Sequence, residues 1–288
     1  MSEAIIVIPC YNEAERLDVR QFREFSRGRG YPQFMFVNDG STDGTREMLD
    51  ALHRSDPDRF AVCDLPKNTG KGEAVRQGVL RAFESGPDYV GYWDADLATP
   101  LDAILNFSSL LDSRPDIEMV FGARVCLLGR LVKRKAPRHF LGRMFATAVS
   151  LALGIRIYDT QCGAKLFRTS SEMMSLFQYP FCTRWIFDVE ILARLIATRR
   201  GTDRSRVEEV IYEFPLHKWH DVAGSKLNPG DFAMALFELA AISWKYRPKA
   251  KTACEPRGAT APGVTLTHTK GIPAPVSLSR GRLVNGTK

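Results

Sequence analysis

Two carboxylates, Asp94 and Asp96, follow directly after an apolar, strand-like run over residues 89–93. In an extended segment the side chains at i and i+2 share a face, so this spacing predicts that the two carboxylates converge where a buried strand ends. Such a pair needs a cation, and hard oxygen ligands suit Mg²⁺ or Mn²⁺, which proteins hold with one or two carboxylates and the phosphates of a substrate. The motif Asp94-Ala95-Asp96 therefore predicts a metal-bound diphosphate.

The same spacing occurs at Asp56 and Asp58, but there it lies in a polar connection interrupted by Pro57, with no apolar strand before it. That second pair is interpreted as a loop. Spacing alone therefore does not distinguish a metal site at Asp94 and Asp96 from a solvated turn at the end of a strand. The neighbouring motifs have to distinguish these two interpretations.

The bulk composition is that of a soluble globular protein with one substantial core: 288 residues, 44% hydrophobic and 25% charged. Six cysteines occur without C-x-x-C spacing, and we find no signal peptide before Ile5, so a disulfide or zinc framework is not expected. The composition indicates a reducing, cytoplasmic setting.

The net charge of +7 is unevenly distributed, because residues 249–288 contain most of it. This region is rich in Pro, Gly, Thr and Ala and has no periodic apolar pattern, so residues 248–288 are predicted to form a disordered basic tail. A solubilising extension is favoured over a tether to membrane or nucleic acid.

A second basic region lies within the body of the chain, where residues 120–158 contain eight Lys or Arg and no Asp or Glu. Residues 140–154 inside it are almost wholly apolar apart from Arg143, but a bilayer span needs about 20 residues. Basic residues followed by an apolar helix are typical of an element that lies on an anionic membrane surface, here about 124–154. A core or dimer-interface helix after a solvated basic loop is the alternative, and the oligomeric state stays open.

Apolar strands alternate with helical periodicity over the first hundred residues, which predicts an α/β fold with a mostly parallel central sheet and flanking helices. Strands are expected at residues 4–8, 34–37, 60–63, 89–93, 117–123, 164–167 and 207–214. Helices are expected at residues 12–26, directly after the polar turn 38–45, after Gly72, at 187–199 and at 231–245. Since open α/β sheets bind ligands at the carboxyl ends of their strands, the polar turns 9–13, 38–45 and 94–96 should meet in one crevice.

Several motifs, in their order along the chain, resemble the signature of family 2 glycosyltransferases of GT-A fold: Ile8-Pro-Cys-Tyr-Asn-Glu13, Val37-Asn-Asp-Gly-Ser-Thr-Asp-Gly-Thr45, Asn68-Thr-Gly-Lys-Gly72 and Asp94-Ala-Asp96. The downstream half is similar to the polyprenyl-phosphate sugar transferases, above all the dolichyl-phosphate β-glucosyl branch, at Phe121-Gly-Ala-Arg124, Asp159-Thr-Gln-Cys-Gly-Ala-Lys-Leu-Phe167, Trp185-Ile-Phe-Asp-Val-Glu190 and Trp219-His-Asp-Val-Ala-Gly-Ser-Lys226. The resemblance covers about residues 3–246.

The resemblance implies a GT-A domain over residues 1–247 that moves a sugar, with inversion, from a nucleotide-sugar donor to a polyprenyl phosphate. UDP-glucose is the favoured donor and GDP-mannose the other candidate, because mannosyl relatives place Gln two residues after the second metal Asp, where this chain has Ala98. Glucosyl relatives in eukaryotes usually carry an N-terminal membrane helix, which we do not find before the first strand. Contact with the cytoplasmic face of a membrane is therefore expected to be peripheral.

On the donor side, the resemblance implies that the nucleoside is held by Pro9, Tyr11, Glu13 and Asp39. Turn carboxylates can accept hydrogen bonds from base and ribose, although Asp39 in an Asx turn is the alternative. Lys71, between two glycines, can approach a diphosphate closely, or it is an ordinary lysine at a helix start.

On the acceptor side, the candidates for guiding a lipid phosphate are Arg124, Arg138, Arg143 and Lys226, because guanidinium groups bind phosphate oxygens in pairs. A solvated basic face is the alternative for Arg138, Arg143 and Lys226. The resemblance places Asp159 and Gln161 near the transferred sugar, where a self-satisfied turn is the alternative. Asp188 is a weaker catalytic candidate, since a carboxylate near a helix N-terminus stabilises the helix by itself.

Two other functions remain open on sequence grounds. Transfer to a soluble hydroxyl would need a general base, for which Asp159 and Asp188 are the candidates, whereas a phosphate acceptor is already an anion. A nucleic-acid-binding protein would use residues 120–158 and the tail. No nucleic-acid-binding fold is recognisable and the basic stretch runs into an aliphatic helix, so we expect no nucleic acid as partner.

Overall fold

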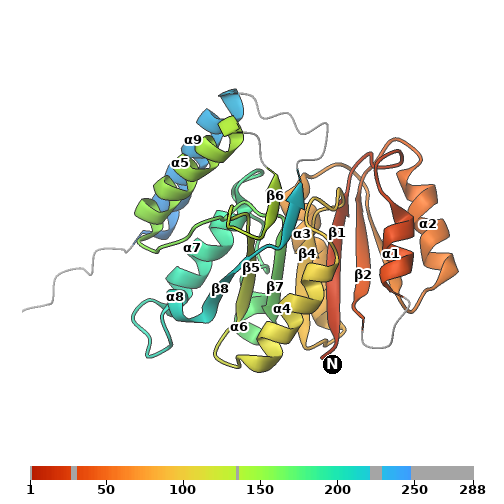
Figure 1. The fold of residues 1–288 in the computed structure, drawn as a ribbon, viewed down its shortest axis with the longest axis horizontal. Helices are drawn as coiled ribbons and strands as arrows, with labels where there is room; N and C mark the ends of the chain where they lie inside the picture. The colour runs from red at the N-terminus through yellow and green to blue at the C-terminus, as the bar shows by residue number, and fades with distance from the viewer. Residues whose placement is uncertain (1, 27–30, 134–135, 221–228, 248–288) are drawn as a thin grey trace, which may run out of the picture. The chain divides into compact units, whose positions relative to one another are not determined.

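A computed structural model describes residues 2–26, 31–133, 136–220 and 229–247. Its centre is a seven-stranded sheet with the order β3-β2-β1-β4-β7-β5-β8 (Figure 1). The strands are β1 Ala4–Cys10, β2 Gln33–Asp39, β3 Phe60–Leu65, β4 Tyr89–Trp93, β5 Met119–Ala123, β7 Ala164–Arg168 and β8 Ile211–Pro215. A second, two-stranded sheet pairs β6 (Leu131–Lys133) with β9 (Lys218–His220).

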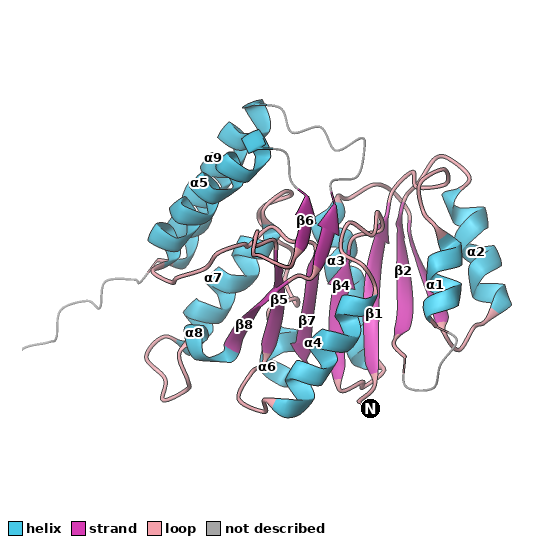
Figure 2. Cartoon of the chain, viewed as in Figure 1, coloured by secondary structure: helices cyan, strands magenta, loops and turns pink. Residues whose placement is uncertain are grey.

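Helices cover both faces of the large sheet (Figure 2). They are α1 Val19–Phe25, α2 Thr45–Ser55, α3 Lys71–Glu84, α4 Asp102–Ser113, α5 Ala136–Leu153, α6 Ser171–Ser175, α7 Phe187–Arg199, α8 Val207–Val210 and α9 Pro229–Tyr246. Alternation along β1 explains the layers, because Ile5 and Val7 join the core under α3 and α7, whereas Ile6 and Ile8 join the core under α1, α2 and α4. The sequence-based prediction of a mostly parallel α/β sheet with flanking helices is confirmed.

One strand runs against its neighbours, and this reversal builds the site. β1, β2, β3 and β4 are parallel, but β7 is antiparallel to both β4 and β5, with Ala164 opposite Trp93. The segment that precedes β7, residues 159–163, therefore lies at the edge where β4 and β5 end. This edge is the one at which open α/β sheets bind ligands.

Several element boundaries differ from those expected. The helix expected at residues 12–26 begins only at Val19, because Asn12 has a left-handed φ of 52° and the Asp18 carboxylate caps the Arg20 amide at 3.1 Å. The strand expected at 207–214 begins at Ile211, since the four residues before it form α8. α4, α6, β6 and β9 were not expected.

The stretch 124–154 contains β6 and the 18-residue helix α5, which ends before Gly154 at a φ of 70°. Among the described residues, no helix combines the length and the apolar character that crossing a bilayer requires. Residues Met1–Pro248 cluster as one compact unit. The predicted tail at 248–288 lies outside the described residues.

Close packing of α3 on the sheet makes a stability prediction. A Cβ added at Gly78 would lie 2.5 Å from a methyl group of Val7 and 2.6 Å from one of Val37, whereas a Cβ at Gly230 in α9 meets nothing within 4 Å. We expect Gly78→Ala to lower the free energy of unfolding by about 1–3 kcal/mol through overpacking. Gly230→Ala, the matched control, should change it by less than about 1 kcal/mol. Urea denaturation measures both, and equal stability of the two variants would contradict the packing described.

Candidate active site

The carboxylate pair lies in a tight turn at the end of β4. The strand ends at Trp93, the Leu97 amide donates to the Asp94 carbonyl at 3.2 Å, and Leu97 has a left-handed φ of 52°. The expectation that Asp94 and Asp96 share one face of an extended segment is therefore wrong, because a turn replaces the strand. Burial, and then the charge of Asp94, raise the pKa of the Asp96 carboxyl, so the two carboxylates still act on each other in this turn.

The backbone of Gly163 and the side chain of Lys71 enclose Asp94. The Asp94 amide donates to the Gly163 carbonyl at 2.9 Å, and a Cβ on Gly163 would lie 2.0 Å from Asp94 Oδ2. Lys71 Nζ lies 2.5 Å from Asp94 Oδ1. Burial alone would lower the pKa of Lys71, but the charges of Asp94 and Asp188 raise it above its usual value. The lysine at the start of α3 thus stays charged and faces the acidic turn.

Glu13 belongs to the same acidic group. Its amide donates to Thr45 Oγ1 at 2.8 Å, which fixes the turn after β1 against the start of α2. Burial raises the pKa of Glu13, Arg16 opposes the rise, and the charge of Asp96 adds to it. The turns after β1 and β4 therefore meet as the sequence predicted. Pro9 lies near the end of β1 and the Tyr11 side chain is 45% exposed, so both remain candidates for a nucleoside contact.

Asp39 is bound within the protein. It is buried, and its two carboxylate oxygens accept from the Thr69 amide, the Thr69 hydroxyl and the Gly70 amide, each at 2.8 Å. The Asx-turn alternative for Asp39 is wrong, because these partners lie 30 and 31 residues away, and the neighbouring Asn38 makes the local bond to Ser41 N instead. Asp39 fixes the loop that leads to Lys71, and a nucleoside contact stays a prediction.

Arg184 is a site neighbour that the sequence analysis did not single out. A Cβ on Gly70 would lie 3.3 Å from Arg184 Nε, so the guanidinium rests against the first residues of α3 beside Lys71. Glu238 of α9 holds this loop by accepting from the Arg184 amide at 3.3 Å and the Ile186 amide at 3.2 Å. No local pattern in the sequence indicated this position.

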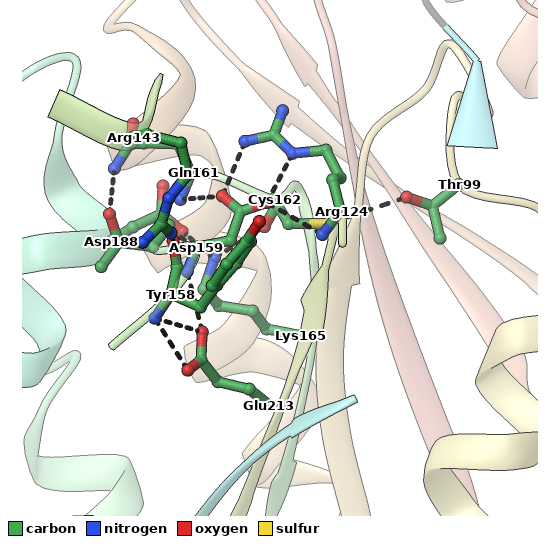
Figure 3. A network of polar contacts seen from close by, with 11 residues as sticks. Thr99, Arg124, Arg143, Tyr158, Asp159, Gln161, Cys162, Lys165, Asp188 and Glu213 are labelled. Carbon is green, nitrogen blue, oxygen red and sulfur yellow. Dashed lines mark hydrogen bonds and ion pairs between the residues drawn. The ribbon is translucent and has the colours of Figure 1, made fainter. Parts of the chain in front are cut away.

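Arg124 and Asp159 pair with each other at the carboxyl end of β5 (Figure 3). Arg124 Nε and Nη2 donate to the two Asp159 oxygens at 2.6 and 2.7 Å, and the Gln161 amide donates to Oδ1 at 3.2 Å. Glu213 of β8 accepts from the Tyr158 and Asp159 amides at 2.8 Å, and burial raises the pKa of this carboxyl. Asp159 is therefore part of a fixed loop.

Arg143 of α5 faces the same loop. Its Nη1 donates to the Tyr158 carbonyl at 2.6 Å, and its guanidinium lies 3.7 Å from the centre of the Tyr158 ring. A small pocket is lined by Arg124, Arg143, Gln161 and their neighbours. The backbone of Arg138 belongs to α5, but its side chain lies outside the described part of the chain. Lys226 lies wholly outside it.

Below the acidic turn lies a buried polar cluster. Asp188, in the first turn of α7, accepts from the Tyr92 hydroxyl and, at 2.5 Å, from Lys165 Nζ. Lys165 is fully buried and also donates to the carbonyls of Thr160 at 3.0 Å and Cys162 at 2.7 Å (Figure 3). The sequence analysis missed Lys165 and Tyr92, although a lysine within an apolar strand was a usable signal.

The acidic turn fits a divalent cation shared with a substrate. Among the described residues, no group of three or more His, Cys, Asp or Glu is arranged to hold a metal ion by itself. Asp94 and Asp96 would provide two carboxylates, which is the usual protein share of a Mg²⁺ site completed by phosphates and water. The cradle formed by Gly163 suits such a cation, as do the burial and the charge of Asp94, which together raise the pKa of Asp96.

A mostly parallel α/β sheet with a carboxylate turn and a lysine at its carboxyl edge is the arrangement expected from the resemblance to glycosyltransferases of GT-A fold. The family model for glycosyl transferase family 2 matches residues 5–173, more than half of the chain. The chain belongs to this family.

Curated relatives include dolichyl-phosphate β-glucosyltransferases. That of Saccharomyces cerevisiae is 33% identical over 77% of this chain and 68% of its own length. One from Trichomonas vaginalis is 32% identical over 85% and 74%. The human enzyme is 30% identical over 78% and 69%.

Solved structures share the fold at low identity. Glucosyl-3-phosphoglycerate synthase of Mycobacterium tuberculosis, in complex with Mn²⁺, UDP and glucosyl-3-phosphoglycerate, has a TM-score of 0.59 at 18% identity, covering 86% of this chain and 82% of that one. A mannosyltransferase from Pyrobaculum calidifontis in complex with GDP-Man and Mn²⁺ has a TM-score of 0.55 at 20% identity, covering 86% and 65%.

The acidic turn makes a prediction for catalysis. Asp96→Ala should lower turnover at least about 100-fold, because a bound metal supplies several kcal/mol and each ~1.4 kcal/mol is tenfold in rate. Asp58→Ala, in the other Asp-x-Asp sequence, should leave turnover unchanged. Steady-state transfer assays measure the turnover of both variants. Full activity of Asp96→Ala would contradict a role of a metal bound at the acidic turn in catalysis.

Proposed function

We propose that this protein transfers glucose, with inversion, from UDP-glucose to a polyprenyl phosphate of the dolichyl type, using Mg²⁺ or Mn²⁺. The observation that carries the proposal is the acidic turn at Asp94 and Asp96, which faces Lys71 at the carboxyl edge of the sheet. The names of the curated relatives support glucose and the lipid phosphate. The neighbours crystallised with Mn²⁺ and nucleotide ligands support the metal and the donor class.

On the donor side, Lys71 is placed to donate to the diphosphate, and its raised pKa keeps it cationic. Glu13 and Tyr11 at the end of β1 would hold the nucleoside. When bound to Asp94 and Asp96, the divalent cation would neutralise negative charge on the departing nucleoside diphosphate. The start of α3 also favours anions, because its first amides point out of the helix and carry a partial positive charge.

On the acceptor side, the arginine-lined pocket beside the 158–161 loop is proposed to receive the phosphate. Arg143 and Arg124 both border it, and guanidinium groups suit phosphate oxygens. Gln161 and Asp159 border the same pocket and would lie near the transferred sugar. Arg138 and Lys226 remain proposed contributors whose side chains the structure does not describe.

A peripheral membrane location on the cytoplasmic face is part of the proposal. α5 and α9 lie side by side and leave large apolar side chains exposed (Figure 1). On α5 these are Phe140, Leu141, Met144 and Leu151, and on α9 they are Met234, Leu236, Phe237 and Trp244. The segment before α5 adds Leu127 and Leu128 from a loop and Leu131 from β6, within a stretch that lacks acidic residues. A basic, apolar surface of this kind suits anionic lipid headgroups.

The direct test is a transfer assay with purified protein, Mn²⁺, a panel of nucleotide sugars and a prenyl phosphate. We expect sugar transfer from UDP-glucose in preference to GDP-mannose, and stabilisation of the fold by the preferred donor, because a ligand that binds only the folded state raises the melting temperature. Transfer to a soluble hydroxyl acceptor in lipid-free buffer, with none to prenyl phosphate, would favour the alternative enzyme. Absence of transfer from every donor would overturn the proposal.

The proposed membrane surface is tested by flotation with vesicles containing anionic lipid. Phe140→Glu and Phe237→Glu should weaken vesicle binding about tenfold or more, because each phenylalanine contributes about 1.5–3 kcal/mol when it leaves water. Tyr179→Glu is the control, since the Tyr179 side chain is 74% exposed but belongs to neither α5 nor α9. Unchanged flotation of both phenylalanine variants would contradict the proposed membrane surface. A DNA gel shift at defined salt tests the alternative that the protein binds nucleic acid.

A further inference from the structure

The two glycines that flank Lys71 are both approached by the segment that leads into α7. A Cβ on Gly70 would lie 3.3 Å from Arg184 Nε and 3.4 Å from Nη2, and a Cβ on Gly72 would lie 3.1 Å from the Phe187 side chain. Gly70 also has a φ of 96°, which favours glycine. The two glycines therefore allow the Arg184 guanidinium and the Phe187 ring to lie directly against the residues next to Lys71.

The backbone that carries Arg184 is held by two helices. Glu238 of α9 accepts from the Arg184 amide at 3.3 Å and from the Ile186 amide at 3.2 Å. Glu190 of α7, which is fully buried, accepts from the Cys182 amide at 2.7 Å. These bonds fix the chain on both sides of the arginine. Less conformational freedom is therefore lost when the guanidinium binds a ligand, which favours binding.

The Arg184 side chain is exposed, and no hydrogen bond or ion pair engages its guanidinium within the described part of the chain. Nearby carboxylates serve other donors. Glu238 accepts from backbone amides, and Glu73 in the first turn of α3 binds Arg76 at 2.6 Å. The N–H donors of Arg184 therefore remain available beside Lys71, the lysine proposed to bind the diphosphate.

We propose that Arg184 is a second cationic binding residue for the diphosphate of the nucleotide-sugar donor, and that Glu238 is the positioning residue that holds it. This inference rests on the proposed function, in which Lys71 donates to the same diphosphate. A guanidinium binds two phosphate oxygens at once, whereas an ammonium acts as a point charge. Arg184 would therefore fix the orientation of the diphosphate as well as neutralise part of its charge.

The acidic groups at this edge of the sheet give a second cation its purpose. Burial, and after it the charges of neighbouring carboxylates, raise the pKa of both Glu13 and Asp96, so negative charge is already unfavourable here. A diphosphate adds more negative charge to the same edge. Lys71 is already shared with Asp94, at 2.5 Å, whereas Arg184 brings a cation from another segment.

Titration calorimetry with UDP and with uridine, both in the presence of Mn²⁺, tests the role of Arg184. We expect Arg184→Ala to weaken UDP binding at least about tenfold, as loss of a charge-assisted hydrogen bond does, and to leave uridine binding unchanged. Arg184→Lys should have an intermediate affinity for UDP, because lysine keeps the charge and loses the paired geometry.

The matched control is Arg54→Ala. Arg54 is also exposed, but it lies in the last turn of α2, which runs back from the end of β2 to the start of β3. Since β2 and β3 are parallel, this turn lies at the opposite edge of the sheet, and the variant should bind UDP as the wild-type protein does.

The outcomes separate the inference from the proposed function. Unchanged UDP binding by Arg184→Ala would overturn the inference and leave the proposed function intact. An equal loss for UDP and uridine would also overturn it, because the effect of the arginine would then not depend on the diphosphate. Failure of the wild-type protein to bind UDP with Mn²⁺ would instead remove the proposed function on which the inference rests.

A double-mutant cycle tests Glu238 as the positioning residue. Glu238→Ala alone should weaken UDP binding, because the loop that carries Arg184 loses both of its bonds to α9. In the Arg184→Ala background the same substitution should cause no further loss, since the guanidinium that it positions is already absent. A general structural effect would lower the affinity equally in both backgrounds. Equal losses would therefore overturn the positioning role.

Discussion

The repulsion between two carboxylates in one tight turn is the constraint on which this site depends. Asp94 and Asp96 raise the local negative charge at the end of β4, and burial increases the cost of that charge. Lys71 relieves part of it at 2.5 Å, which ties the start of α3 to the turn. A divalent cation with a diphosphate is the remaining partner that such an arrangement favours. Without a cation, the buried negative charge of the acidic turn is energetically unfavourable. The turn is therefore suited to binding a metal-bound anion.

The reversed strand β7 supplies the support for this turn. Because β7 runs antiparallel to β4, its preceding loop arrives at the carboxyl edge and presents Gly163 to Asp94. Lys165, two residues further on, donates hydrogen bonds to two carbonyls of this loop and connects the loop to α7 by its contact with Asp188. Glu213 fastens the start of the loop from β8. Three strands and one helix therefore fix a segment that has no regular secondary structure of its own.

Local sequence patterns predicted the parts of the fold that depend on local physics. Apolar runs located the strands of the sheet, and the abrupt change from Trp93 to Asp94 located the acidic turn. Long-range contacts were beyond reach: nothing near β7 in sequence indicates that it runs antiparallel, and Asp39 contacts residues 30 positions away. The i, i+2 argument correctly paired Asp94 with Asp96, but it assumed an extended segment. The segment is instead a turn with Leu97 in a left-handed conformation. A lysine within an apolar strand is recognisable in the sequence as unusual, but the three groups that accept hydrogen bonds from Lys165 could not be predicted from it.

Calorimetric titration of UDP tests the central claim most directly, because it reports on the acidic turn without requiring turnover. Wild-type protein should bind UDP at least about tenfold more tightly with Mn²⁺ than with a chelator, as expected when a metal links two carboxylates to a diphosphate. In Asp94→Asn this difference should disappear. Equal UDP affinity with and without Mn²⁺ in the wild-type protein would contradict the account, since the carboxylate turn would then have no cation to share with the substrate.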